Sequence, residues 1–269
     1  MSQTGILKGK AAFVAGGTSG INLGIARALA EAGASVAVLS RSQEKVDGAV
    51  AELRSVGVGA LGYAADVRNE EAVAAAIKAA ADTMGPLDVV VSGAAGNFIC
   101  PAAAMSGKGF RTVIEIDLIG TFHVMRAAFD VARKPGCSMI NISAPQSTMP
   151  YWGQAHVSAA KAGVDMLTKS LAYEWGEYGI RLNAIVPGPI EGTEGMKRLS
   201  PTDEARRAVE DSVPLRRYGT ISDIAEIALF LASDQSSYVT GTVIACDGGQ
   251  LLAGAGLFRP PLTTRQHIR

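Results

Sequence analysis

The sequence has little of what marks a secreted, metal-dependent or nucleic-acid-binding protein. It holds only 3 cysteines in 269 residues, and Cys100, Cys137 and Cys246 form no CxxC pair. We therefore expect reduced thiols and no metal site. The 25 basic and 25 acidic residues cancel, so no net field attracts nucleic acid or an anionic membrane, and we expect neither as a partner. The expected ligand is a small molecule.

Long apolar runs and a targeting pattern are also lacking. Apolar stretches such as 74–81 are short and broken by charge, far below the roughly 20 apolar residues that a membrane span needs. Residues 1–5 lack the layout of a signal peptide, and residues 264–269 carry no recognisable organelle address. These absences predict a cytoplasmic protein.

Apolar segments of strand length alternate with longer segments of helical pattern, which is typical of βαβ units around a parallel sheet. We expect strands at Ala11–Ala15, Ser35–Ser40, Leu61–Ala65, Val89–Ser92, Ser138–Ile142, Arg181–Val186 and Val243–Ala245. We expect helices beginning near Ile21, Glu44, Glu70, Gly109, His156 and Ser222. Without a repeat or a long linker, this order predicts a single α/β domain over residues 1–269, a doubly wound parallel sheet of the Rossmann type.

The segment from about 191 to 215 differs from the rest of the chain. Two glycines, two prolines and many charged residues lie there between strongly patterned elements. We expect a small helical lid over the substrate, and an ordinary surface insertion is the alternative.

A glycine-rich loop, GGTSGI at 16–21, follows the first expected strand and opens the helix after it. Its glycines let the backbone approach a pyrophosphate, and free amides at the helix start receive the negative charge. A tight connection alone is the alternative, but the order of strand, loop and helix favours a dinucleotide site. The expected cofactor contacts in this loop are Gly16, Thr18, Ser19, Gly20 and Ile21.

The second expected strand ends at Ser40-Arg41, where an NAD site often presents an acidic residue to the adenine ribose. Arg41 instead suits the 2′-phosphate of NADP through paired, charge-assisted hydrogen bonds. We therefore expect NADP(H) as the cofactor, with a solvated surface arginine as the alternative. The ends of the third and fourth strands add further expected cofactor contacts, which are Asp66, Val67, Ala94, Ala95 and Gly96.

These motifs resemble the short-chain dehydrogenase/reductase family over nearly the whole chain. The resemblance rests on the loop at 16–21, Asp66-Val67, Ala94-Ala95-Gly96, Asn141-Ile142-Ser143, Lys161, Pro187-Gly188-Pro189-Ile190 and Asp247-Gly248-Gly249. It implies a nicotinamide cofactor that also contacts Pro187, Gly188 and Ile190. It further implies that the Lys161 ammonium binds the nicotinamide ribose hydroxyls, with a merely solvated lysine as the alternative.

The departures from the family pattern are more informative than the matches. The family's serine, seventeen residues before the lysine, is Ala144, and its tyrosine, four residues before the lysine, is Val157. Neither side chain donates a proton, and a carbonyl reductase without its acid loses typically about 10²-fold or more in rate. Ketone chemistry is therefore disfavoured. The loop's last glycine is Asn22, a residue that tolerates left-handed backbone angles, so we expect phosphate binding to survive.

This substitution pattern looks like that of the 2,4-dienoyl-CoA reductases, most closely the peroxisomal type. The matching stretches are 94–98, Cys100-Pro101, Asp117 with Gly120-Thr121-Phe122, His156 with Ala160-Lys161, Glu174-Trp175-Gly176 and 187–195. The resemblance implies NADPH-dependent reduction of a 2,4-dienoyl-CoA thioester to a 3-enoyl-CoA. It also implies a pair of Asp117 and Lys161 in place of tyrosine and lysine, and a homotetramer.

The residue types at this pair suit reduction of a conjugated carbon–carbon double bond. Hydride adds to carbon, charge accumulates on a thioester oxygen, and the last proton goes to carbon. A bare carboxylate beside that charge would raise the barrier, so Asp117 must be neutralised by Lys161 or be protonated. We expect Asp117, with Lys161, to orient a water that protonates the dienolate carbon. The alternative is an aspartate that caps backbone amides at a helix start.

Three residues are expected to bind substrate. The Asn97 amide would contact the thioester, Phe98 would line the acyl channel, and Arg68 would meet a phosphate of the CoA or remain solvated. His156 either contacts substrate or begins a helix. Structural roles are expected for Asn141, at the end of a strand, and for Tyr151 and Tyr173, which lack the usual spacing to Lys161.

Two other functions stay open. One is another NADP-dependent reductase of this fold that acts on enones or thioesters. The other is a non-catalytic NADP-binding protein, in which Ala144 and Val157 are signs of decay. A binding module would be expected to lose Lys161, so the retained lysine and Asp117 favour an enzyme.

Overall fold

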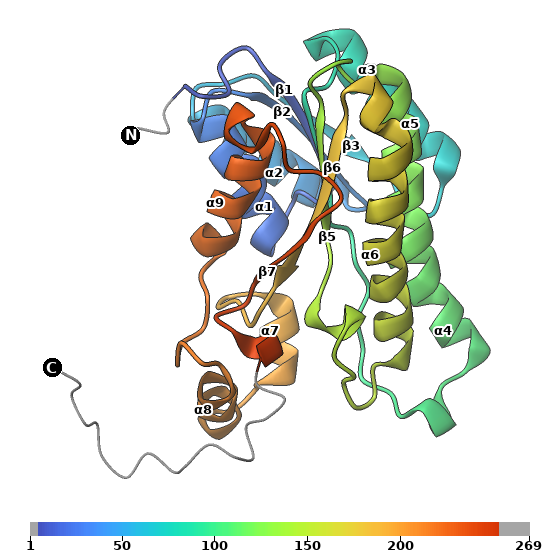
Figure 1. The fold of residues 1–269 in the computed structure, drawn as a ribbon, viewed down its shortest axis with the longest axis vertical. Coiled ribbons are helices and arrows are strands. Elements are labelled where there is room, and N and C mark those ends of the chain that lie inside the picture. The colour runs from blue at the N-terminus through green and yellow to red at the C-terminus, as the bar shows by residue number, and fades with distance from the viewer. Residues whose placement is uncertain (1–4, 253–269) are drawn as a thin grey trace, which may run out of the picture.

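The computed structural model describes residues 5–252, which are organised around one seven-stranded parallel sheet (Figure 1). Its strand order is β3-β2-β1-β4-β5-β6-β7. The strands are β1 Ala11–Ala15, β2 Ser35–Ser40, β3 Ala60–Ala64, β4 Val89–Ser92, β5 Ser138–Ile142, β6 Arg181–Pro187 and β7 Val243–Cys246. Each strand end lies within one residue of its predicted position, and the doubly wound sheet is confirmed.

Helices cover both faces of the sheet, as Figure 1 shows. On one face, α1, α2 and α9 pack against the strands, and on the other face α3, α5 and α6 do so. The bounds are α1 Gly20–Glu31, α2 Gln43–Ser55, α3 Glu70–Met84, α5 Gly120–Val131, α6 Ala155–Trp175 and α9 Ile221–Ala232. Every residue of β1, β4 and β5 is buried, which explains why these strands are mostly apolar without strict alternation. Their polar members are Ser92, Ser138 and Asn141.

The helix predicted near Gly109 has a more complex form than the sequence indicates. It begins as α4 (Gly107–Val113), passes through a π-helical turn, η2 (Ile114–Ile119), and continues as α5. Such π turns are rare and occur frequently at functional sites. Asp117 lies in the middle of this turn.

Two short helices form the segment expected as a lid. They are α7 (Glu194–Leu199) and α8 (Asp203–Ser212), below the carboxyl ends of the strands in Figure 1. Each begins after a threonine, Thr193 or Thr202, whose hydroxyl accepts a hydrogen bond from an amide of the first turn. The segment is therefore helical, as expected.

The position of the site follows from the order of the strands. The chain moves outward from β1 through β2 and β3, and then returns to place β4 on the other side of β1. At such a switch point the loops diverge at the carboxyl edge of the sheet and leave a crevice for ligands. Within residues 5–252, no helix has both the length and the apolar character that crossing a membrane requires.

Candidate active site

Two neighbouring cavities occupy the crevice at the carboxyl edge of the sheet. The larger has a volume of about 550 Å³ and the smaller about 280 Å³. Asn22, Gly93 and Ala95 line both of them, so the two cavities meet between α1 and the end of β4.

The smaller cavity has the form of a dinucleotide-binding groove. A Cβ atom on Gly16, whose φ is +78°, would lie 2.8 Å from the Ala94 amide nitrogen, so only glycine permits this close approach. Ser19 precedes α1 with an extended backbone, and its side chain caps none of the helix amides, which leaves them open to a phosphate. The predicted residues that line this groove are Gly16, Thr18, Ser19, Arg41, Asp66, Val67, Ala94 and Ala95.

Asn22 works differently from the expectation. It lies inside α1, and Arg216 is the only non-glycine residue with positive φ in the described range, so the left-handed tolerance of asparagine is not used. Instead, Asn22 Nδ2 donates a hydrogen bond to the Gly93 carbonyl at 2.8 Å. The side chain thus ties the start of α1 to the loop after β4, where the two cavities meet.

Two cations line the adenosine end of the groove. Arg41 is there, as expected, and Lys45 of α2 joins it. Arg68 is not part of either cavity wall: its guanidinium forms a bidentate ion pair with Asp66, with a shortest distance of 2.6 Å. The Arg68 hydrogen bonds, more than any other contact, lower the pKa of the Asp66 carboxyl. The structure thus places Arg68 beside the cofactor groove and away from the larger cavity.

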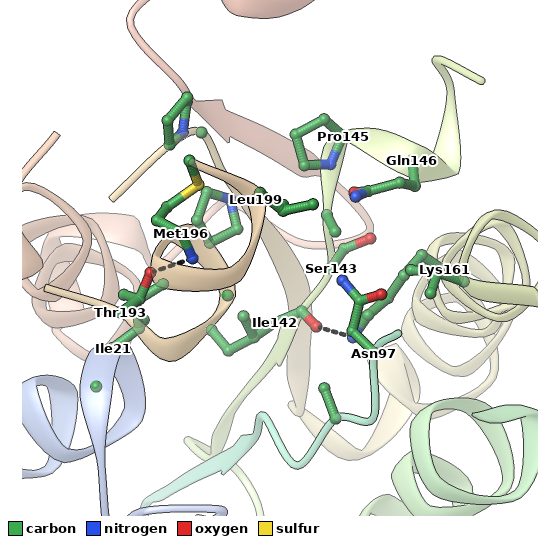
Figure 2. A pocket seen from close by; sticks show the side chains of 18 of the residues that line it. Ile21, Asn97, Ile142, Ser143, Pro145, Gln146, Lys161, Thr193, Met196 and Leu199 are labelled. Carbon is green, nitrogen blue, oxygen red and sulfur yellow. Dashed lines mark hydrogen bonds between the residues drawn. The ribbon is translucent and has the colours of Figure 1, made fainter. Parts of the chain in front are cut away.

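Asp117 and Lys161 meet in the wall of the larger cavity. The Lys161 ammonium donates to the Ile142 carbonyl at 2.9 Å and lies 3.4 Å from Asp117 Oδ2. Asp117 Oδ1 accepts a hydrogen bond from the Gly96 amide at 2.7 Å. Figure 2 shows Lys161 reaching from its helix to the end of the Ile142 strand. Both charged groups are almost fully buried, with 1% of Asp117 and 5% of Lys161 exposed.

The environment of Asp117 has opposing effects on its charge. Burial raises the pKa of the carboxyl above its ordinary value, while the Lys161 charge and the Gly96 amide act in the opposite direction. Asp117 does not cap a helix start, because it lies within the π turn and its amide partner belongs to the loop after β4. It is a buried carboxylate held in place from two sides.

The two positions that lack hydroxyls also face this cavity. Ala144 and Val157 both belong to its lining, as do Asp117 and Lys161. The positions that we assigned to the family's serine and tyrosine thus each contribute an apolar side chain to the cavity wall.

The lid segment covers the same cavity. Thr193, Met196 and Leu199 face it from the α7 side in Figure 2, and Val209 of α8 joins them. Most of these side chains are apolar, which suits an acyl chain. The lid role remains a prediction, and the geometry fits it.

Other predicted residues are placed as follows. Gly20, Ile21, Gly96, Asn97, Pro187 and Gly188 line the larger cavity, whereas Ile190 lines a separate cavity between β6, β7 and the lid. Phe98 packs on His156 with ring centroids 4.4 Å apart, and His156, fully buried, lines neither cavity.

The structural roles expected for two polar residues are clear. Asn141 Nδ2 donates to Thr168 Oγ1 at 2.9 Å in the core, and Tyr173 is 90% exposed. Tyr151, which we expected to pack or to be exposed, instead lines the larger cavity, and burial raises the pKa of its phenol. Ser143 and Gln146 also line the cavity, and the sequence gives no signal that points to Gln146.

Sequence and structure comparisons identify the family. The family model for enoyl-(acyl carrier protein) reductase matches residues 15–250. A solved structure of a short-chain dehydrogenase from Bacillus anthracis is 38% identical, with a TM-score of 0.83, over 91% of this chain and 97% of that one. The chain belongs to the short-chain dehydrogenase/reductase family. Members of this family work with a nicotinamide cofactor, which fits the glycine loop and the groove beside it.

Two curated members of the family are similar along most of their length. The peroxisomal 2,4-dienoyl-CoA reductase of Arabidopsis thaliana, described as (3E)-enoyl-CoA-producing, is 42% identical over 92% of this chain and 86% of its own. A probable 2,4-dienoyl-CoA reductase of Bacillus subtilis, described as (2E)-enoyl-CoA-producing, is 42% identical over 90% of this chain and 97% of its own.

Proposed function

We propose that this short-chain dehydrogenase/reductase reduces 2,4-dienoyl-CoA thioesters to 3-enoyl-CoA with NADPH. The observation that carries the proposal is the buried pair of Asp117 and Lys161, set in a cavity whose serine and tyrosine positions are Ala144 and Val157. Similarity to two enzymes named as 2,4-dienoyl-CoA reductases supports the choice of substrate.

The cofactor proposal rests on charge at the adenosine end of the groove. Arg41 and Lys45 supply two cations where a 2′-phosphate would lie, and Ser40, the last residue of β2, adds no negative charge. The glycine loop and the start of α1 would hold the pyrophosphate, and Lys161 would hold the ribose hydroxyls of the nicotinamide half. When bound, the nicotinamide supplies a hydride for the terminal carbon of the diene.

Side chains of the protein then offset the developing negative charge and orient the water that supplies the proton. As hydride reaches the δ carbon, the double bonds shift and negative charge moves to the thioester oxygen, giving a dienolate. The α carbon takes a proton from water, and the hydroxide that remains takes up a proton from solvent. This leaves one double bond between the β and γ carbons. Asp117 accepts a hydrogen bond from that water, and Lys161 offsets the carboxylate charge so that it does not oppose the dienolate.

The apolar side chains at 144 and 157 argue against ketones as substrates. Reduction of a ketone forms an alkoxide that needs a proton on oxygen, and neither Ala144 nor Val157 provides one. A thioester dienolate is protonated on carbon, so hydrogen bonds and a positioned water are sufficient.

Steady-state kinetics test this proposal. Purified protein is mixed with NADPH and, in separate assays, a 2,4-dienoyl-CoA, a 2-enoyl-CoA, a simple enone and a ketone. We expect NADPH oxidation with the dienoyl-CoA and little with the ketone, and NADH should serve poorly. Oxidation with the enone alone would favour a different reductase, and no oxidation with any substrate would favour a non-catalytic NADP-binding protein.

Assembly and location are part of the same proposal. We infer a homotetramer, in keeping with the family resemblance, and large apolar side chains such as Phe122 of α5 and Met166 of α6 are exposed on one chain. We also propose a cytoplasmic location, as expected above.

A further inference from the structure

Two buried polar groups in the wall of the larger cavity lack a hydrogen-bond partner within residues 5–252. They are Oγ of Ser143, a residue 3% exposed, and Oε1 of Gln146, a residue 8% exposed. Buried polar groups are nearly always hydrogen-bonded, because an unmade bond destabilises the fold. The Ser143 hydroxyl can donate, whereas Oε1 of Gln146 only accepts. The missing partner of Ser143 therefore indicates a ligand atom that accepts a hydrogen bond in this cavity.

The backbone around Ser143 is firmly held. Ser143 follows β5 directly, and its amide donates to the Ile185 carbonyl of β6 at 2.8 Å. The preceding carbonyl, that of Ile142, is the acceptor of the Lys161 ammonium. The Ser143 hydroxyl therefore has a fixed position one residue from the lysine contact.

A second buried amide orients the Gln146 side chain. Gln146 Nε2 donates to Gln154 Oε1 at 2.7 Å, and Gln154 is also buried. Since an amide nitrogen carries two hydrogens, one N–H of Gln146 remains for a ligand. Figure 2 shows the Ser143 hydroxyl and the Gln146 amide in the same part of the cavity as Lys161.

We propose that the Ser143 hydroxyl and the free N–H of Gln146 bind the thioester carbonyl oxygen and stabilise the negative charge that develops on it. This assignment rests on the proposed reduction of a dienoyl-CoA. The two donors would replace, from positions 143 and 146, the hydroxyls that the family supplies from the positions of Ala144 and Val157. Their immediate neighbours, Ala144 and Pro145, are apolar and also line the cavity, so the hydrogen bonds act with little solvent screening.

Neutral donors suit this position because the nearby charges are already engaged. Lys161 is held by the Ile142 carbonyl and by Asp117. The Asp117 carboxylate repels an oxyanion, so the dienolate oxygen is best placed on donors that belong to another segment of the wall. Ser143 follows β5 and Gln146 lies in the 3-10 turn η3 (Pro145–Ser147), whereas Asp117 comes from η2.

Three single variants and one double variant test the assignment. In Ser143→Ala and Gln146→Leu we expect kcat with dienoyl-CoA to fall by about 10²-fold, the typical effect of removing one oxyanion donor. In both variants the Kd for NADPH should stay within about twofold of the wild type. Ser147→Ala is the matched control, because Ser147 Oγ is also buried and unpartnered in the described chain but Ser147 lines neither cavity; its kcat should not change. The double variant should be no more active than the weaker single variant.

A spectroscopic measurement separates a direct contact from a structural role. Hydrogen bonds to the carbonyl polarise the conjugated thioester, so dienoyl-CoA bound to the NADP⁺ complex should show a red-shifted absorption band. The red shift should be retained in Ser147→Ala and lost in the double variant. If Ser143→Ala does not fold, the absorption of dienoyl-CoA bound to Gln146→Leu tests the assignment by itself.

Each outcome bears on a defined claim. A wild-type protein that reduces no dienoyl-CoA overturns the proposed function itself. An active wild type with unchanged kcat and unchanged absorption in the variants overturns only the assignment of Ser143 and Gln146. A rise in the Kd for NADPH without loss of kcat at saturating NADPH also overturns it, because the two groups would then bind the cofactor.

Discussion

Asp117 shows most clearly how one residue changes the chemistry of a shared fold. The buried negative charge of Asp117 is tolerated because Lys161 lies 3.4 Å from Oδ2 and the Gly96 amide donates to Oδ1. The carboxylate thus has a structural anchor on one oxygen and a cation beside the other. We assign to Oδ2, the carboxylate oxygen nearest Lys161, the hydrogen bond that orients the proton-donating water.

Removing this carboxylate should affect turnover far more than cofactor binding. In Asp117→Ala we expect kcat with dienoyl-CoA to fall by about 10²-fold or more, because the water that protonates the α carbon loses its acceptor. The Kd for NADPH, measured by fluorescence titration, should stay nearly constant. Unchanged turnover would remove Asp117 from the mechanism.

The raised pKa of Asp117 predicts a pH dependence. Since the ionised carboxylate is the form that orients water, kcat should decrease as the pH falls through a pKa above the ordinary value of 3.8. The folded chain holds this proton more tightly than the unfolded chain, so the Asp117 contribution to the free energy of unfolding is present at low pH and lost as the pH rises through the folded pKa. Initial rates of the wild type and of Asp117→Asn across pH check this. The decrease of kcat at low pH should be absent in Asp117→Asn. If kcat decreases at the same pH in both proteins, another group is responsible for the decrease.

Residue roles could be predicted from the sequence only where a motif carries them. The loop at 16–21, Asp117 and Lys161 are in known motifs, and the structure places all of them in the walls of the two cavities. The binding roles of Ser143 and Gln146 could not be identified in this way, although Ser143 lies in the Asn141-Ile142-Ser143 motif, because a buried group without a partner is a result of packing and not of spacing. Arg68 illustrates the reverse case, since its neighbour Asp66 holds it by an ion pair that no motif indicates.

Among the elements, strands were predicted best and helix details least. Strands buried on both faces are apolar runs bounded by turns, so their ends are visible in the sequence. The π turn of η2 was not predicted, because it is defined by its backbone hydrogen bonds and no residue type in this segment marks it. That turn places Asp117 toward Gly96, so a functionally important feature was the least visible one.

The lid is the element whose contacts are easiest to alter without reaching the catalytic pair. Arg206 of α8 forms an exposed ion pair with Glu191, and its guanidinium lies 5.1 Å from the centroid of the buried Tyr218 ring. Surface ion pairs contribute roughly 0–1 kcal/mol, so Arg206→Ala should leave the melting temperature almost unchanged.

The same variant should loosen the lid over the substrate. We expect the KM for dienoyl-CoA to rise several-fold, while the Kd for NADPH stays as in the wild type. Lys78→Ala is a suitable control, because its exposed ion pair with Asp82 belongs to α3. An equal KM in Arg206→Ala and the wild type would support a surface insertion with no role in binding.

For the whole molecule, the fold class followed from the alternation of strands and helices, but assembly did not. A single chain exposes Ile119, Phe122, Met166 and Tyr173 on η2, α5 and α6, and exposed apolar side chains on neighbouring elements are typical of a subunit interface.

Light scattering should therefore give four times the mass of one chain. Phe122→Asp should lower this mass, because a charge would be buried at the interface. Lys134→Asp, in the exposed turn after α5, is a control that should leave the mass unchanged. A monomeric wild type would contradict the inferred tetramer without affecting the assignment of the active site.

The position of the solvent-derived hydrogen in the product tests the central claim most directly. Reduction of a 2,4-dienoyl-CoA with NADPH is run in heavy water, stopped early and analysed by NMR and mass spectrometry. If water held by Asp117 and Lys161 protonates the α carbon, the product is a 3-enoyl-CoA with one deuterium on the α carbon and none at the δ carbon. A 2-enoyl-CoA with deuterium on the γ carbon would contradict this account, because the proton would then be delivered two carbons further from the thioester.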